Sequence, residues 1–130
     1  MRSLAILAGI LLPCWLLTAE VICFEQMRLK PLHCVCGKFT DMLNEPVAAV
    51  TVIAFRDGKE VARTTSGQDG RFRFEVLKPG SYELRADPLG YREFRCPIVV
   101  STPGTKCKRR LTIFLDASGL ESCGSRVVKQ

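Results

Sequence analysis

Hydrophobic and polar residues alternate in short runs along most of this 130-residue chain, and turn-forming residues separate the runs. The clearest run is residues 71–76, RFRFEV, in which two phenylalanines and a valine alternate with charged residues. Successive side chains of a strand point to opposite faces, so this pattern predicts a strand with one buried and one solvated face. The same reasoning predicts seven strands: 33–41, 47–55, 60–66, 71–76, 81–86, 92–100 and 106–115.

Short turn motifs indicate how these strands connect. Asp57-Gly58 between two strand-like runs is typical of a two-residue hairpin. Pro79-Gly80 favours a tight turn. Pro97 cannot donate a backbone hydrogen bond, so its strand is expected at the edge of a sheet. The chain is therefore predicted to be an all-β, seven-stranded antiparallel Greek-key sandwich of two sheets.

Residues 1–19 have the features of an export signal. Arg2 precedes an uncharged apolar run at 4–17, and small residues follow up to Ala19, after which cleavage is expected. Cleavage nearer Cys23 and an uncleaved anchor are the alternatives. The apolar run is shorter than the roughly 20 residues of a membrane-spanning helix, so no stable span is expected after cleavage. These features predict a secreted or periplasmic/extracellular protein. Its predicted parts are a signal peptide (1–19), an N-terminal tail (20–32), the sandwich (33–116) and a C-terminal tail (117–130).

The chain has seven cysteines, of which Cys14 would be lost with the signal peptide. An even number of cysteines in a short exported chain indicates disulfides. Cys96 and Cys107 flank the expected last hairpin and are predicted to face each other. Cys34 and Cys36 share one strand face and would reach that pair or a cysteine of a tail. The six disulfide candidates are Cys23, Cys34, Cys36, Cys96, Cys107 and Cys123.

The run HCVC also offers imidazole and thiolate ligands for a metal at His33, Cys34 and Cys36. The single residue between the two cysteines, and the need for a second pair, favour disulfides over zinc. His33 is the only histidine of the chain, and no serine lies in a nucleophile-elbow context. The sequence therefore predicts no catalytic residue, no metal and no cofactor, and the protein is not expected to be an enzyme.

The net charge of +6 is a mild positive excess for a chain of this size. Arg71, Arg73 and Arg85 would point outward from consecutive strands, and residues 106–110 (KCKRR) form an unrelieved basic run. Interleaved glutamates favour a solvated face, with weak attraction to anionic polymers as the second interpretation. Apart from Phe114 this face lacks aromatic side chains on which bases stack, so no specific nucleic acid is expected.

Several landmarks resemble those of a known family. Gly37 lies in the first predicted strand, Pro46-Val47 opens the second, and TSGQDGRFRF and LKPGSY follow in order. With these residues the chain is similar to the carboxypeptidase regulatory-like family of prealbumin-like sandwiches, over roughly residues 34–115. The resemblance implies a prealbumin-like sandwich. It also implies an exported, non-catalytic module for binding or accessory structure.

Related sandwiches bind carbohydrate, so the resemblance implies a polysaccharide or an envelope or extracellular protein as partner, with Tyr91 in PLGY as the candidate ligand contact. The alternative is a structural or protein-interaction domain that acts through an edge strand and binds no small ligand. Transthyretin-related hydrolases of this fold use several histidines, an arginine and a C-terminal Tyr-Arg-Gly-Ser. This chain has one histidine and ends in SRVVKQ, so it lacks that cluster.

The exported protein is expected to begin at Glu20, because the signal is predicted to be removed after Ala19. The intact mass of protein recovered from outside the cytoplasm tests this. A mass that still includes residues 1–19 would show a retained anchor, and a start beyond Cys23 would show that the cleavage site is misplaced.

Overall fold

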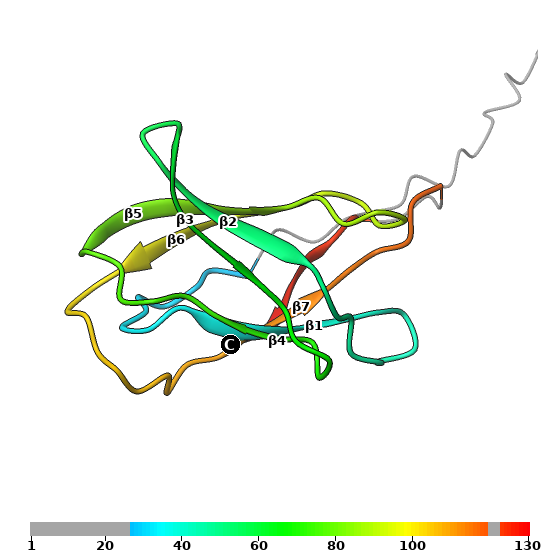
Figure 1. Cartoon of the computed structure of the whole chain (residues 1–130), viewed down its shortest axis with the longest axis horizontal. Helices are drawn as coiled ribbons and strands as arrows, with labels where there is room; N and C mark the ends of the chain where they lie inside the picture. Colours follow the sequence, from blue (N-terminus) through cyan, green and yellow to red (C-terminus); the bar gives the residue numbers. More distant parts are fainter. Residues whose placement is uncertain (1–26, 120–122) are drawn as a thin grey trace, which may run out of the picture.

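The computed structural model of the protein describes residues 27–119 and 123–130 (Figure 1). This part of the chain forms eight strands in two four-stranded sheets, which confirms the predicted all-β, two-sheet class. The β1 sheet has the order β4-β1-β7-β8, and the β2 sheet has the order β3-β2-β5-β6. The strands are β1 (Cys36–Thr40), β2 (Thr51–Arg56), β3 (Lys59–Thr65), β4 (Arg71–Arg73), β5 (Gly80–Ala86), β6 (Phe94–Val100), β7 (Leu111–Phe114) and β8 (Arg126–Lys129). Among the described residues there is no helix long and apolar enough to cross a membrane.

The β2 sheet is built from antiparallel neighbours. Its first hairpin places Arg56 opposite Lys59 across a two-residue turn. The turn residues Asp57 and Gly58 have φ values of 52° and 75°, and positive φ at both positions matches the twist of the flanking strands. The predicted hairpin is therefore confirmed. β6 lies at the edge of the sheet, which confirms the position expected for Pro97.

β1 lies inside the other sheet, between β4 and β7. Gly37 is opposite Phe72 of antiparallel β4 and opposite Leu111 of parallel β7. The expectation of seven antiparallel strands is therefore wrong in two respects. One pair is parallel, and residues 117–130, expected to be a tail, supply β8, which pairs with β7. Two valines in SRVVKQ are too short a run to indicate a strand, but Val127 packs against the core.

Residues 101–110, the crossing segment, carry the chain from one sheet to the other. β6 ends at the edge of the β2 sheet, and β7 begins inside the β1 sheet. The expected hairpin between these two strands is therefore wrong, as is a last strand that begins at residue 106. Pro103, Gly104 and the basic run favour an irregular connection, because proline and glycine interrupt strands.

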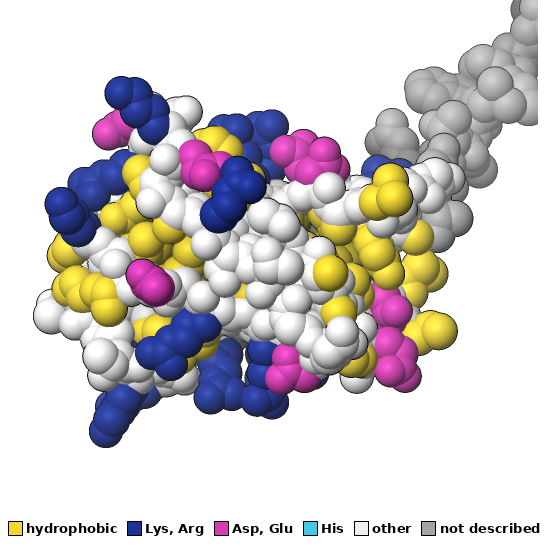
Figure 2. Space-filling model, viewed as in Figure 1, with side chains coloured by type: hydrophobic (Ala, Val, Ile, Leu, Met, Phe, Trp, Pro, Cys, Tyr) yellow, Lys and Arg dark blue, Asp and Glu magenta, His cyan; other side chains and the backbone are white. Residues whose placement is uncertain are grey.

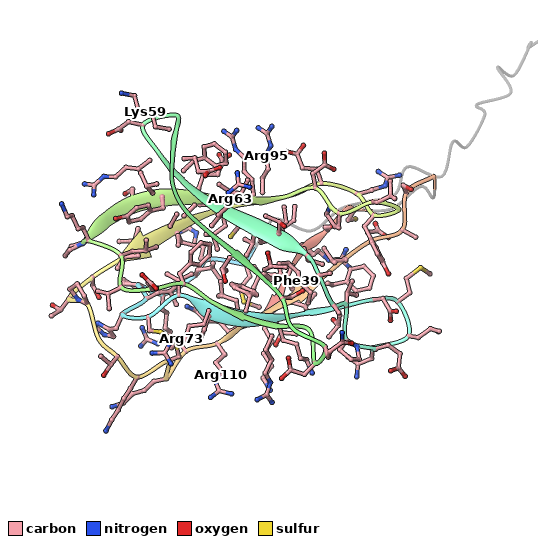
Figure 3. All side chains as sticks on the ribbon, in the orientation of Figure 1. Phe39, Lys59, Arg63, Arg73, Arg95 and Arg110 are labelled. Carbon is pink, nitrogen blue, oxygen red and sulfur yellow. A yellow bond between two sulfur atoms is a disulfide. The ribbon has the colours of Figure 1, made fainter. Side chains whose placement is uncertain are left out.

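The core lies between the sheets and is centred on Phe39 (Figure 3). The Phe39 ring centroid is 4.9 Å from that of Phe72 in its own sheet and 6.5 Å from that of Phe94 in the facing sheet. Aromatic contacts at these distances add to the burial of apolar surface. They join the two sheets at the level of β1.

Gly37 permits a close approach at the centre of the β1 sheet. A Cβ atom at this position would lie 2.4 Å from the carbonyl oxygen of Leu111 and 2.9 Å from the ring of Phe72. The first neighbour is backbone and cannot rotate away. A side chain here would push β7 from β1 or displace the phenylalanine from the core.

Replacing Gly37 with Ala is expected to lower the free energy of unfolding by about 3 kcal/mol, the upper end of overpacking costs. Urea unfolding followed by circular dichroism measures this. Gly104→Ala is the matched control, because its Cβ would meet His33 at an ordinary 3.5 Å. Equal stability of the two variants would contradict the close packing of β1 on β7.

Candidate functional site

The candidate site lies on the outer face of the β1 sheet. Val35 and Phe39 are buried in the core, and Gly37 shares their face. Cys36 and Lys38 therefore face away from the core, because neighbouring side chains of a strand point to opposite faces. Cys36 is nevertheless buried, so the outer face is covered at this end of β1.

β4 adds two arginines to this face. Phe72 is buried, so Arg71 and Arg73 on either side of it point outward. Arg73 lies opposite Cys36, and Arg71 lies opposite Lys38. Side chains that face each other across antiparallel strands are within contact range. The alternation of RFRFEV predicted the outward arginines, but it contained no signal for the pairing of β4 with β1.

The crossing segment completes the site on the other side of β1. We name the resulting hollow of about 390 Å³ the basic cleft. Arg73 and Arg110 both point away from the sandwich on this side (Figure 3). A guanidinium nitrogen of Arg73 donates a hydrogen bond to the carbonyl oxygen of Thr105, which ties β4 to the crossing segment. The cleft is lined by Cys36, Gly37, Lys38, Thr65, Arg71, Phe72, Arg73, Cys107, Arg110, Leu111 and Thr112.

The cations of the basic cleft have little negative charge beside them. No aspartate or glutamate of the described residues forms an ion pair with Lys38, Arg73 or Arg110. Arg71 has one carboxylate neighbour, Asp69, at 3.8 Å. An unbalanced cluster of like charges creates a positive potential that attracts anions.

Most arginines of the β2 sheet, unlike the cations of the basic cleft, are paired with a carboxylate. Arg63, Arg85 and Arg95 each form an ion pair with a nearby glutamate, Glu60, Glu83 and Glu93 respectively. Arg85 was expected on one stripe with Arg71 and Arg73, but it belongs to the other sheet. Figure 2 shows basic and acidic side chains along the upper edge, and a group of basic side chains along the lower edge with acidic ones beside it toward the right. The cations without a carboxylate partner, Lys38, Arg73 and Arg110, lie on the outer face of the β1 sheet.

A disulfide joins the start of β1 to the crossing segment. It links Cys34 to Cys107, with 5.0 Å between their Cα atoms. The predicted pairing of Cys107 with Cys96 is wrong, because β6 and the crossing segment do not form a hairpin. Cys96 instead faces the core with a free thiol, and burial raises its pKa to about 11. Cys123 is also disulfide-bonded. Of the remaining candidates, Cys23 lies outside the described residues, as does Cys14.

Cys36, also a disulfide candidate, carries a free thiol in the cleft. Its sulfur and those of Cys34 and Cys107 all lie within 4.8 Å of one another. Burial raises the pKa of the Cys36 thiol, while the nearby positive charges of Arg110 and Arg73 act in the opposite direction. Sequence reasoning placed Cys34 and Cys36 on one face, but the approach of Cys107 depends on the path of the crossing segment.

His33 and Tyr91, the two other residues singled out in the sequence, lie elsewhere. The His33 Nδ1 atom is 2.7 Å from the carbonyl oxygen of Thr102, so the ring is held by the crossing segment and is not grouped with the three sulfur atoms. Tyr91 is half-buried, packs against the core and forms a backbone bridge with Ala117. Neither residue lines the basic cleft.

Comparison with known proteins agrees with this architecture. The sequence profile of the carboxypeptidase regulatory-like domain matches residues 35–115. The chain belongs to this family. The domain that defines the family is a non-catalytic β-sandwich with a regulatory role.

Two individual proteins are similar to the chain. Colossin-A of Dictyostelium discoideum is 41% identical over 66 residues, which are 50% of this chain and 1% of that protein. The chain thus spans about one hundredth of that relative's length. The structure of Klebsiella pneumoniae 5-hydroxyisourate hydrolase superposes with a TM-score of 0.57 and 18% identity, covering 75% of this chain and 98% of the hydrolase. At this identity the similarity shows the fold alone, which is prealbumin-like.

The bonded residues Cys34 and Cys107 are separated by 73 positions in the sequence, so the disulfide closes a long loop in the unfolded chain. Replacing Cys107 with Ser is therefore expected to lower the free energy of unfolding by about 4 kcal/mol. Denaturant unfolding without a reducing agent measures the loss. Lys106→Ser changes the neighbouring residue and keeps the disulfide, so its stability should stay within about 0.5 kcal/mol of the parent protein. A Cys107→Ser protein as stable as this control would contradict the role given to the bond.

Proposed function

We propose that this protein is an exported, non-catalytic accessory module that binds an acidic polysaccharide in the basic cleft. The observation that carries the proposal is the uneven distribution of charge between the two sheets. In the β2 sheet, Arg63, Arg85 and Arg95 are each paired with a glutamate, and Arg56 donates a hydrogen bond to the Tyr82 hydroxyl. Lys38, Arg73 and Arg110 have no carboxylate partner among the described residues. Binding of an anion would supply the missing negative charge.

The chemistry of the cleft fits a sugar acid. Guanidinium groups bind carboxylates through two parallel hydrogen bonds, which Arg73 and Arg110 offer at an exposed position. The hydroxyls of Thr65 and Thr112 also line the cleft and suit the hydroxyl groups of a sugar ring. Phe72, the aromatic residue of the cleft, is buried under β1. The cleft therefore lacks the exposed aromatic platform on which the bases of a single-stranded nucleic acid would stack.

Two further observations support an exported, non-catalytic role. The signal-like residues 1–19 and the Cys34–Cys107 disulfide fit a compartment that oxidises thiols. The only histidine of the chain, His33, is held at the crossing segment by the carbonyl oxygen of Thr102. The Ser101 hydroxyl also lies 3.1 Å from His33 Nδ1, but no aspartate or glutamate is hydrogen-bonded to this histidine among the described residues, so a complete acid–base set does not converge there.

The second candidate function is protein binding through an edge strand. β3 is seven residues long and lies at the edge of the β2 sheet, which leaves one side of its backbone available for pairing. However, charged residues such as Lys59 and Arg63 lie along it, and a β-bulge interrupts its pairing with β2. Charges and bulges are the usual means by which proteins discourage pairing at an edge. This function therefore ranks below binding in the cleft.

The mature protein is expected to bind polygalacturonate, an acidic glycan, and not neutral dextran, with affinity that falls as salt is added. Removing two cleft charges in Arg73→Gln/Arg110→Gln should weaken binding by roughly thirtyfold, because each charge contributes on the order of 1 kcal/mol. Isothermal titration calorimetry measures the affinity of the parent protein for each glycan and the loss of affinity in the double variant. The matched control is Arg63→Gln/Arg95→Gln, which removes the same charge from the β2 sheet and should bind normally.

Each other result has a definite meaning. Equal loss in the two double variants would show that only net charge matters and would overturn the cleft. Loss in Tyr91→Ala with normal binding by Arg73→Gln/Arg110→Gln would move the site to the loop that carries Tyr91. Equally tight binding to single-stranded DNA would show a general polyanion surface. Absence of binding to any glycan would favour the edge-strand function.

A further inference from the structure

A free thiol lies beside a disulfide in the basic cleft, and the proposed function makes no use of this arrangement. The sulfur atoms of Cys34, Cys36 and Cys107 lie within 4.8 Å of one another, and the first and last are bonded. Cys36 is the third member and is reduced. Cys96, the other free cysteine of the described chain, faces the core from β6 and is not part of this group.

We propose that these three cysteines form a thiol–disulfide exchange site, in which Cys36 displaces Cys34 from Cys107. The Cys36 thiol loses its proton, and its sulfur forms a bond to the sulfur of Cys107. The bond between Cys107 and Cys34 breaks, and Cys34 leaves with the electron pair and then takes up a proton. The numbers of thiols and disulfides are unchanged, so the step needs no oxidant or reductant.

The local structure permits both linkages. Cys34 lies in a bend just before β1 and Cys36 is the first residue of β1, and the sulfur atoms of both lie within 4.8 Å of the sulfur of Cys107. Their partner, Cys107, belongs to the irregular crossing segment and not to a strand, so its position is not fixed by a ladder of backbone hydrogen bonds. A change of side-chain torsions and a small displacement of this segment bring Cys107 from one sulfur to the other.

The charges around Cys36 favour its role as the nucleophile. The attacking species in disulfide exchange is the thiolate, which nearby positive charge stabilises. Arg73 of β4 lies directly opposite Cys36, Arg110 of the crossing segment lies on its other side, and Lys38 follows it on β1. Burial raises the pKa of Cys36 and opposes these charges, so exchange becomes faster as the pH rises. Cys96 lies in the core, where burial raises its pKa to about 11.

Exchange moves the free thiol to a different environment. Cys34 lines a second hollow of about 550 Å³, together with His33, Phe74 and Leu77. The new Cys36–Cys107 bond would instead lie in the basic cleft, between Arg73 and Arg110. The two isomers therefore present different surfaces to a ligand or to a second thiol.

The test uses the full exported chain without reducing agent. Protein is incubated at pH 7 and at pH 9 with N-ethylmaleimide, digested, and sequenced by mass spectrometry with the disulfides intact. Fragmentation between Cys34 and Cys36 identifies which of them carries the label and which is bonded to Cys107. We expect molecules labelled at Cys34 that contain the Cys36–Cys107 bond. They should form faster at pH 9 than at pH 7, because the Cys36 thiolate that attacks the disulfide increases about tenfold per pH unit below its pKa.

Four variants make the result specific. Cys36→Ser should abolish the Cys34 label, whereas Cys96→Ser, the matched control, should keep it. Cys34→Ser should form the Cys36–Cys107 bond directly. Arg110→Gln should lower the rate at which exchanged protein forms roughly twofold or more, because it removes a charge that stabilises the thiolate, and Arg95→Gln should not.

Wild-type protein without a Cys34 label at either pH would overturn the proposal, whatever the variants do. An undiminished label in Cys36→Ser, or its loss in Cys96→Ser, would also overturn it, since another thiol would then be the nucleophile. A label whose share grows with protein concentration would show exchange between molecules and would contradict the proposed site. These outcomes are independent of glycan binding, so the two proposals fail separately.

Discussion

β1 and β7 are far apart in the sequence and run side by side in parallel, with Gly37 opposite Leu111 and Phe39 opposite Ile113. Their close approach depends on the absence of a side chain at Gly37. The same pairing directs Phe39 into the core, where it meets aromatic rings of both sheets. Because side chains alternate along a strand, it also directs Cys36 and Lys38 outward. The core and the basic cleft thus lie on opposite faces of β1.

The route of the chain between the sheets explains why the cysteines and the basic residues of the cleft lie together on the outer face of the β1 sheet. To reach β7, the crossing segment must pass over the end of β1, and there Cys107 meets Cys34 and Arg110 meets the outward residues of β4. In the β2 sheet, Arg63, Arg85 and Arg95 each pair with a glutamate two or three residues away in sequence, so these three charges are balanced locally. Those of the cleft come from separate segments and are balanced by no such neighbour among the described residues.

Local sequence signals predicted the local structure well. Asp57-Gly58 predicted its hairpin, and RFRFEV predicted two buried rings with outward arginines, because both patterns depend only on neighbouring residues. The same run was wrong at its end, since β4 stops at Arg73 and Val76 is exposed. The other errors concern contacts between distant segments. The partner of Cys107 and the strand formed by residues 126–129 depend on where the chain crosses, which no local pattern reports. The basic cleft was missed for the same reason: Arg73 and Arg110 are evident in the sequence, but their meeting at Cys36 requires the β4–β1–β7 pairing.

The most direct test of the central claim is a nuclear magnetic resonance titration of the 15N-labelled mature protein with an oligogalacturonate. Backbone amide shifts would locate the bound glycan without any mutation. If the glycan binds in the basic cleft, the largest changes fall in β1, in β4 and in residues 107–112, with little change along β5 and β6. Changes centred on the loop around Tyr91, or spread evenly over the arginines of both sheets, would contradict it.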